Sequence, residues 1–359
     1  KFGFVDSMKI KDFIDYEQPN EYIVESDRYY IKYSTPVLTA GQSFILGYTN
    51  ESKGIYKKGP CIIFDDFTTS VHYVDFPFKV KSSAMKILTT KSNTDLKYCY
   101  YLLLSLSKMP PNHKRQWIST TSEKTHELPS MDKQIAIVKK LDLISDIIAI
   151  YTNQIENLDN LVKARFIEMF GDPIVNEKGW RTKPLLDMGQ CKNGMNFHYD
   201  DKGIDINCLG VCDFKNFSVI DNTKVLPTVS LNEMPSEEYL LKDDDIVFVR
   251  SNGNKALVGR SLVVYPGNVP TTFSGFCIRY RKYDNEIIVP YLLRVLKTDS
   301  VRMKMSGRGA NIQNLNRQIL GTLVIPVPPI ELQEQFADFV QQVDKSRFDI
   351  KKSIIELER

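Results

Sequence analysis

A stretch of forty residues, 131–170, constrains this chain more than any other feature. Its apolar residues recur at alternating steps of three and four, the heptad spacing of a helix that packs along its length against another helix. This seam consists of Leu141, Ile144, Ile148, Tyr151, Ile155, Leu158 and Val162. Ser130 can cap the start and Gly171 can end the helix. At about 1.5 Å per residue, the predicted helix is about 60 Å long.

The C-terminal stretch offers a partner for this helix. A single heptad seam is unstable alone in water, so the long helix needs a second apolar stripe against which to pack. The same spacing occurs at Phe336, Val340, Val343, Arg347, Ile350, Ile354 and Leu357. We therefore expect an antiparallel coiled coil formed within one chain.

The segments that precede the two helices follow one plan. In the first, strands are predicted at 61–64 and 85–88 and a helix at 96–107. In the second, strands are predicted at 245–250 and 257–265 around a hairpin turn at 251–254, followed by a helix at 289–297. We match Tyr101-Leu102-Leu103 with Tyr291-Leu292-Leu293, and the helix start at Gln134 with Gln335.

These patterns predict an α+β fold built as a tandem repeat. Two globular mixed α/β domains, residues 1–127 and 172–327, are joined by helical segments at 128–171 and 328–359. An antiparallel helix pair would relate the two domains by a pseudo-two-fold axis. Such a shape suits a bipartite or two-fold ligand, and duplex DNA fits that description.

Charge and cysteine content narrow the class of protein. The 47 basic and 44 acidic residues leave a net charge of +3, so a polyanionic partner must be bound by local basic patches. Six cysteines in no framework spacing indicate reduced thiols and a cytoplasmic location. No apolar run approaches the roughly 20 residues of a membrane span, so we expect no membrane partner.

Catalytic and metal-binding motifs are not evident. There is no Walker phosphate loop and no paired-histidine metalloprotease motif. Asp172-Pro173 with Glu177-Lys178 superficially resembles a nuclease set, but a helix-terminating turn explains it. Cys208 and Cys212 could form half of a zinc site, although without a second pair they are better explained as core thiols. The four histidines (His72, His113, His126 and His198) are far apart in sequence. We predict no catalytic residue and no metal ligand.

Basic, polar and aromatic residues instead recur in the predicted loops of both domains. Lys and Arg can neutralise phosphates, while Arg, Asn and Gln can contact purine edges through two hydrogen bonds. Any single residue of this kind could equally belong to a solvated loop. In the first domain the candidate DNA-binding residues are Lys53, Tyr56, Lys57, Lys58, Thr68, Thr69, His72, Lys79, Lys81, Ser82 and Ser83. In the second they are Arg250, Asn252, Asn254, Lys255, Arg260, Arg302, Lys304, Arg308, Asn311, Gln313 and Asn314.

The whole chain resembles the specificity subunits of type I restriction-modification enzymes. The likeness rests on Leu128-Pro129 with the helix start at 134–138, on Phe170-Gly171-Asp172-Pro173, and on Lys178-Gly179-Trp180. It also rests on residues 309–315 (Gly-Ala-Asn-Ile-Gln-Asn-Leu) and 325–329 (Ile-Pro-Val-Pro-Pro). The last helix is shorter than the first, which indicates a truncated C-terminus by comparison with the family.

The resemblance implies a function and a set of partners. It implies two target-recognition domains, each of which reads one half of a split sequence in double-stranded DNA. The helices would act as a spacer and as a docking scaffold for two modification (methyltransferase) subunits and a restriction (translocase and nuclease) subunit. Adenine methylation and DNA cleavage would belong to those subunits, which would bind S-adenosylmethionine, ATP and Mg, so this chain would be a non-catalytic subunit without a cofactor of its own.

Two other functions stay open on the sequence alone. One is a DNA methyltransferase or nuclease fused to a recognition domain, which would need an Asn-Pro-Pro-aromatic motif. The Pro-Pro pairs, Pro110-Pro111 and Pro328-Pro329, are not in that setting. The other is a coiled-coil adaptor that binds only protein. Conversion of the basic loop residues to Glu would distinguish it, because DNA binding by the assembled complex should fail if those residues bind DNA.

Overall fold

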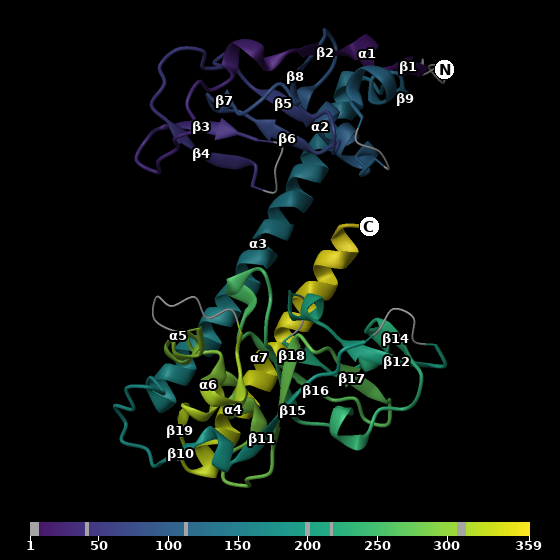
Figure 1. Ribbon diagram of the computed structural model, residues 1–359. Helices are drawn as coiled ribbons and strands as arrows, with labels where there is room; N and C mark the ends of the chain where they lie inside the picture. The colour runs from purple at the N-terminus through teal and green to yellow at the C-terminus, as the bar shows by residue number, and fades with distance from the viewer. Residues whose placement is uncertain (1–6, 40–42, 111–113, 198–201, 216–217, 307–313) are drawn as a thin grey trace. The chain divides into compact units, whose positions relative to one another are not determined.

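The computed structural model describes residues 7–39, 43–110, 114–197, 202–215, 218–306 and 314–359, which form two compact units, Lys1–Ile150 and Tyr151–Arg359. Figure 1 labels their helices and strands. The first unit contains β1 (Ser7–Lys9), α1 (Ile10–Phe13), β2 (Ile14–Glu17), β3 (Thr35–Leu38), β4 (Ile45–Thr49), β5 (Cys61–Asp65), β6 (Val71–Val74), β7 (Lys79–Val80), β8 (Met85–Thr90), α2 (Leu96–Leu106), β9 (Thr125–Glu127) and the start of α3 (Met131–Phe170).

The second unit repeats this series with additions, after the end of α3. It contains β10 (Thr182–Pro184), β11 (Gly189–Asn193), β12 (Ile204–Leu209), β13 (Val219–Ile220), β14 (Thr228–Leu231), β15 (Asp245–Val249), β16 (Ser261–Val264), β17 (Thr271–Phe273), β18 (Cys277–Lys282), α4 (Val289–Leu296), α5 (Asp299–Ser306), α6 (Arg317–Gly321), β19 (Val324–Pro326) and α7 (Ile330–Leu357).

Sheet topology confirms the tandem repeat. The first unit has an antiparallel sheet of order β2-β8-β5-β6, and the second has β11-β18-β15-β16 with β13 added at the edge. Each unit also has a three-stranded sheet with one antiparallel and one parallel pair, β4-β3-β7 and β14-β12-β17. A two-stranded ribbon, β1-β9 or β10-β19, lies next in sequence to each long helix. The two units therefore share one mixed α/β plan.

The predicted apolar strands lie at the centre of these sheets because both of their faces are covered. On β5, Ile62 and Phe64 pack in the core that contains α2, whereas Cys61 and Ile63 pack toward the three-stranded sheet. On β15 the same alternation divides the strand between a core that contains α4 and the helix pair, and a second core. A strand covered on both faces has a continuous apolar run, which explains why the sequence signal was strong.

The return strand in the second unit was predicted too early. The sequence predicted a hairpin turn at 251–254 and a strand from 257 to 265, whereas β16 begins at Ser261. Residues Lys255–Leu257 form a short 3-10 helix capped by Asn254, whose side chain accepts from the backbone N–H of Ala256. This local side-chain hydrogen bond competes with strand pairing, so the connection is longer than a tight hairpin.

The long helix forms with the predicted bounds, Met131–Phe170, and Gly171 ends it at a φ of +76°. Within the second unit its last turns pack antiparallel to α7. The ring of Phe336, near the start of α7, lies 5.5 Å from that of Phe166 and 5.6 Å from that of Phe170. Farther along α7, Arg347 pairs with Asp159, which comes earlier on α3. Contacts that move forward on one helix and backward on the other establish the antiparallel direction.

The predicted seam positions are the less exposed positions of the two helices. Val162, Phe336 and Val343 are buried. The remaining apolar seam residues are half-buried: Leu141, Ile144, Ile148, Tyr151, Ile155, Leu158, Val340, Ile350, Ile354 and Leu357. Within the described parts of the chain, no helix is both long and apolar enough to span a bilayer.

A buried glutamine fixes each unit to its long helix, and it corrects the register of the repeat. The Gln134 side chain accepts from the backbone N–H of Asp95, the N-cap of α2, at 2.8 Å and donates to the carbonyls of Asn93 and Pro129. In the second unit Gln333 accepts from the N–H of Ile288, the N-cap of α4, and donates to the carbonyls of Glu286 and Pro328.

The structural equivalent of Gln134 is therefore Gln333, and matching it with Gln335 was wrong by two residues. Counting from the N-caps of α2 and α4, Tyr98 and not Tyr101 corresponds to Tyr291. Apolar pattern alone could not fix this register, because neighbouring turns of a helix carry similar residues.

The corrected register makes a testable prediction. Changing Gln333 to Leu leaves the Ile288 N–H and two carbonyls without a partner, so the free energy of unfolding should fall by about 2–4 kcal/mol. Gln335 is exposed on the same helix, and Gln335→Leu should change stability by no more than about 0.5 kcal/mol. Urea denaturation of both variants measures the difference, and equal effects would contradict the pairing of Gln134 with Gln333.

Candidate nucleic-acid interface

In the first unit, the predicted DNA-binding residues at 53–58 lie together with those at 79–83. The loop that contains Lys53, Tyr56, Lys57 and Lys58 connects β4 to β5. It lies against β7 because the Tyr56 backbone forms a bridge with Phe78. The residues after β7, among them Lys81, Ser82 and Ser83, are half-buried. Thr68, Thr69 and His72 belong to a different part of the unit.

Exposure separates these residues further. Tyr56 is 1% exposed, with its ring stacked on Phe78 at 4.9 Å. Lys79 is 3% exposed, forms an ion pair of 2.7 Å with Glu51 and donates to the carbonyl of Lys53. We omit Tyr56 and Lys79 from the proposed interface, because their side chains are held in the interior.

The side chains of Thr68, Thr69 and His72 also make most of their contacts within the protein. Thr69 is buried and donates to the carbonyl of Lys108 at 3.0 Å, while the half-buried Thr68 lies 3.0 Å from the Ser70 hydroxyl. His72 stacks on Phe44 with ring centroids 3.8 Å apart, and burial lowers the pKa of its imidazole.

Two of the remaining lysines have acidic partners. Lys58 forms an ion pair with Glu17 and Lys81 forms one with Asp27. Lys53 and Lys57 are exposed, and neither side chain has an ion-pair partner among the described residues. Of the predicted DNA-binding lysines of the first unit, these two are therefore the ones that are both exposed and without an acidic partner among the described residues.

In the second unit the predicted residues converge on the connection between β15 and β16. Arg302 of α5 donates to the carbonyl of Ala256 at 3.2 Å, which joins α5 to this connection. On its other side, Ser251 forms an isolated bridge with Asn314. Lys255, Arg260 and Lys304 are exposed, as are Asn254 and Asn314, whereas Arg250 and Asn252 are half-buried. Arg308, Asn311 and Gln313 lie outside the described residues.

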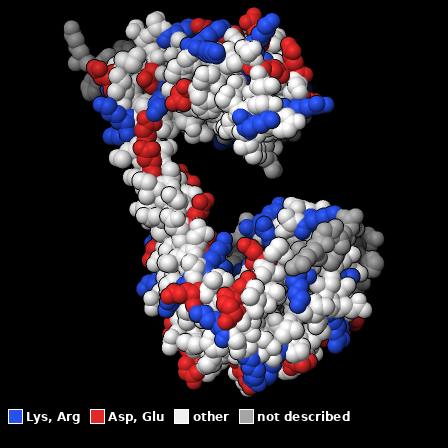
Figure 2. Space-filling view, turned by 90° about the vertical axis from the view of Figure 1, so that its left-hand side faces the viewer, with Lys and Arg blue, Asp and Glu red and all other residues white. Residues whose placement is uncertain are grey.

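Several polar groups of this connection hold the loop itself. Arg250 donates to the carbonyl of Gly275 at 3.0 Å, and the Asn252 side chain accepts from the N–H of Asn254. The exposed cations on either side of these bonds are therefore presented by an ordered loop. Figure 2 shows basic and acidic side chains interspersed over one face of each unit, so binding of a polyanion must depend on such local groups.

Sequence reasoning missed a second group of cations in this unit. Arg294 of α4 and Lys297, the C-cap residue of α4, line a cavity together with Lys163 of α3. Burial lowers the pKa of Lys297 to about 8, and the neighbouring Arg294 acts in the same direction. The spacing of three between Arg294 and Lys297 was the sequence signal that could have indicated this group. Ordinary surface residues of a helix have the same spacing, so the signal was not specific.

The residues that superficially resembled a zinc site or a nuclease site in the sequence are accounted for by the fold. Cys208 is buried and Cys212 exposed, and burial raises the pKa of the Cys208 thiol to about 12. Among the described residues, no three His, Cys, Asp or Glu side chains are grouped as metal ligands would be. Asp172 accepts from the backbone N–H groups of Ile174 and Val175, so it stabilises the turn after α3. His126 is hydrogen-bonded to Tyr98, while His113 and His198 lie outside the described residues.

Comparisons with known proteins agree on one family. Residues 177–359 match the model of the type I restriction modification DNA specificity domain. The chain is 30% identical to a type I restriction enzyme specificity subunit from Escherichia coli, over 95% of this chain and 87% of that protein. A type I specificity subunit from Methanocaldococcus jannaschii is 22% identical, over 94% of this chain and 85% of that one.

Solved structures share the fold. The S subunit of a type I restriction-modification system from M. genitalium aligns with a TM-score of 0.52 at 16% identity, covering 100% of this chain and 95% of that one. A chain from a study of assembly and conformational transition in the type I R-M system aligns with a TM-score of 0.53 at 15% identity, covering 97% and 95%.

Proposed function

Because the chain belongs to the family of type I restriction-modification specificity subunits, we propose that it selects the DNA sequence on which a type I complex acts. The observation that carries this proposal is the 30% identity to the E. coli subunit over 95% of the chain. The repeated sheet plan supports it, since two similar units suit a target in two halves. In this proposal each unit reads one half of the target.

The proposal also assigns partners. Two modification subunits and one restriction subunit would dock on the chain, and they would carry the S-adenosylmethionine, ATP and Mg needed for methylation and cleavage. The chain itself would contribute recognition and spacing without catalysis. Exposed apolar residues on α3, such as Leu143 and Ile150, are candidates for contact with these subunits.

The proposed DNA contacts are exposed cations of the β4–β5 loop and of α5. Lys53 and Lys57 represent the first unit and Lys304 the second. Each phosphate that a protein neutralises makes log K fall by about 0.9 per unit of log salt concentration, so affinity should fall steeply with salt. Which bases are recognised would depend on the individual loops.

Charge reversal tests this assignment. In the complex assembled with modification subunits, Lys53→Glu, Lys57→Glu and Lys304→Glu combined should weaken binding to every duplex. The salt slope should fall by about one for each phosphate that is no longer neutralised. Fluorescence anisotropy across a salt series measures both quantities. Lys224→Glu, at an exposed lysine of the short 3-10 helix Thr223–Val225, serves as the control. If the substitutions leave the affinity unchanged and the affinity does not depend on salt concentration, the adaptor that binds only protein is favoured.

A further inference from the structure

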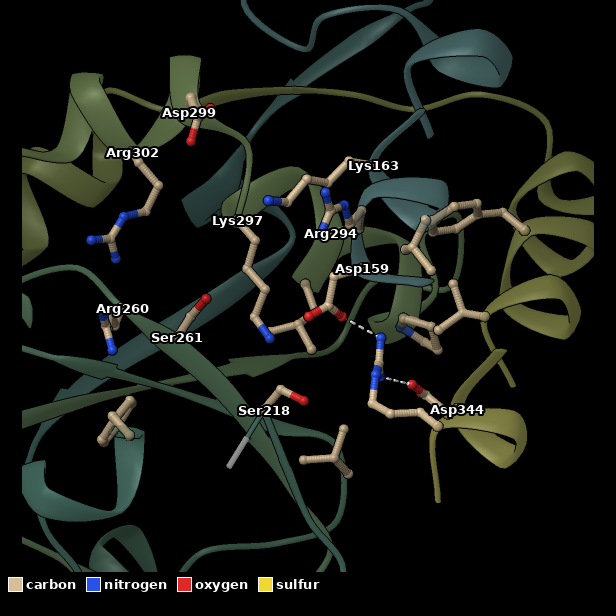
Figure 3. Close-up of a pocket in the computed structure, with 18 of the residues that line it drawn as sticks. Asp159, Lys163, Ser218, Arg260, Ser261, Arg294, Lys297, Asp299, Arg302 and Asp344 are labelled. Atoms are coloured by element: carbon tan, nitrogen blue, oxygen red, sulfur yellow. Dashed lines mark hydrogen bonds and ion pairs between the residues drawn. The ribbon is translucent and has the colours of Figure 1, made fainter. Parts of the chain in front are cut away.

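The second unit contains a cavity of about 500 Å³ that the proposed recognition loops do not explain. Its walls come from α3, α4, α5 and α7, from β13 and the residues before it, and from the start of β16 and the residues before it, all within Tyr151–Arg359. Figure 3 shows Lys163, Arg294 and Lys297 around its centre, with Arg260 and Arg302 toward one end. A cavity of this size could hold a small ligand or a segment of a larger one.

The lining carries an excess of positive charge. Six basic residues and three aspartates line it. Two of these aspartates, Asp159 and Asp344, both pair with Arg347, so one of their two negative charges is balanced by that arginine. Asp299 is the remaining carboxylate and lies in the exposed first turn of α5. Six basic residues against three carboxylates leave the lining with a formal excess of three positive charges, which disfavours a metal cation as its ligand.

Two of these cations are only partly exposed, and their nearby counter-charge, Asp159, pairs directly with Arg347 and not with them. Among the described residues, neither Lys297 nor Arg294 has an ion-pair partner, and the Arg294 Nε atom is buried without a hydrogen-bond acceptor. Burial lowers the pKa of both side chains, which reflects the cost of keeping charge there. A bound anion would offset this cost, because an opposite charge at short range favours the charged form of a lysine.

Hydroxyl groups complete a donor set. Ser261 is 7% exposed, and its buried hydroxyl has no hydrogen-bond partner among the described residues. Ser218 also lines the cavity. Ammonium, guanidinium and hydroxyl groups together match the several acceptor oxygens of a phosphate better than the two of a carboxylate. We propose that this cavity binds a phosphate group.

Two sources share this chemistry. One is a backbone phosphate of the DNA, since Arg260 and Arg302 belong both to the cavity lining and to the predicted recognition loops. This source rests on the proposed function. The other is a free polyphosphate, for which the cavity is large enough to hold more than one phosphate group.

Titration of the full-length chain with tripolyphosphate tests the proposal without DNA. Isothermal titration calorimetry should detect binding that Lys297→Gln weakens by at least about tenfold, because a charge-assisted bond is removed. Lys297→Arg should retain most of the affinity. Lys163→Gln, at an exposed position of the lining, should also weaken binding and avoids any loss of folding. Lys351→Gln is the control, because Lys351 is exposed on α7 and does not line the cavity.

Competition with a short duplex then separates the two sources. If duplex DNA displaces tripolyphosphate and Lys297→Gln weakens both ligands, the cavity takes a backbone phosphate. If both ligands bind together and only tripolyphosphate depends on Lys297, the cavity takes a free polyphosphate. Tripolyphosphate binding that is absent, or unaffected by Lys297→Gln and Lys163→Gln in folded protein, would overturn the proposal. Failure of the proposed function would appear separately, as DNA binding that the combined Lys53→Glu, Lys57→Glu and Lys304→Glu substitutions do not change.

Discussion

Replacing residues 172–327 with the equivalent segment of the E. coli relative is expected to change one half of the methylated DNA sequence and to leave the other half as it was. The physical reason is that each unit has its own cores. Residues of the first unit make up two of the four clusters, and the other two consist of residues from 158 onward. Mapping methylated adenines made by the assembled complex measures the outcome, and a hybrid in which both halves change would contradict independent recognition.

The structure also shows where such a hybrid is weak. The boundary at 172 passes through a core, because Phe166 and Phe170 of α3 pack with Phe336 of α7 around Tyr291. A second hybrid that exchanges residues 151–359 keeps this aromatic group from one parent. We expect both hybrids to switch the same half-sequence and the longer one to have the higher Tm, since mismatched aromatic packing costs about 1–3 kcal/mol.

Periodicity is the part of the structure that the sequence could predict. The heptad steps along 141–162 and the continuous apolar run at Cys61–Phe64 are local signals, and both elements formed as predicted. Their strength comes from burial on a defined face, which constrains every residue of the segment. The bounds of α3 followed from Gly171, because a glycine at positive φ ends a helix efficiently.

Contacts between residues that are far apart in the sequence could not be predicted from it. Lys79 was taken for a loop cation because its partner Glu51 is far away in the sequence and nothing local indicates the pairing. The cavity cations were missed for the same reason, since Lys163 and Lys297 are brought to one site only by packing of α3 near α4. Arg308, Asn311 and Gln313 lie outside the described residues, so their role in DNA binding stays a prediction.

The length of α3 is expected to set the gap between the two half-sequences. Inserting seven residues after Ile148 adds two turns, so it lengthens the helix by about 10 Å and changes the angle between its ends by only about 20°. DNA rises about 3.4 Å per base pair, so the gap should widen by at most about three base pairs. Both half-sequences should be unchanged when methylated adenines are mapped.

The helical twist of the DNA limits how well the wider gap can be bound, and it therefore determines the activity of the variant. Three added base pairs turn the duplex by about 100°, so the second half-site faces a different direction unless the DNA twists to compensate. We therefore expect the wider gap to be methylated at a reduced rate. Inserting five residues is the matched control, because it lengthens α3 by about 7.5 Å but rotates its ends by about 140°, and it should abolish methylation. Full activity at the original spacing in the seven-residue variant would show that α3 does not set the gap.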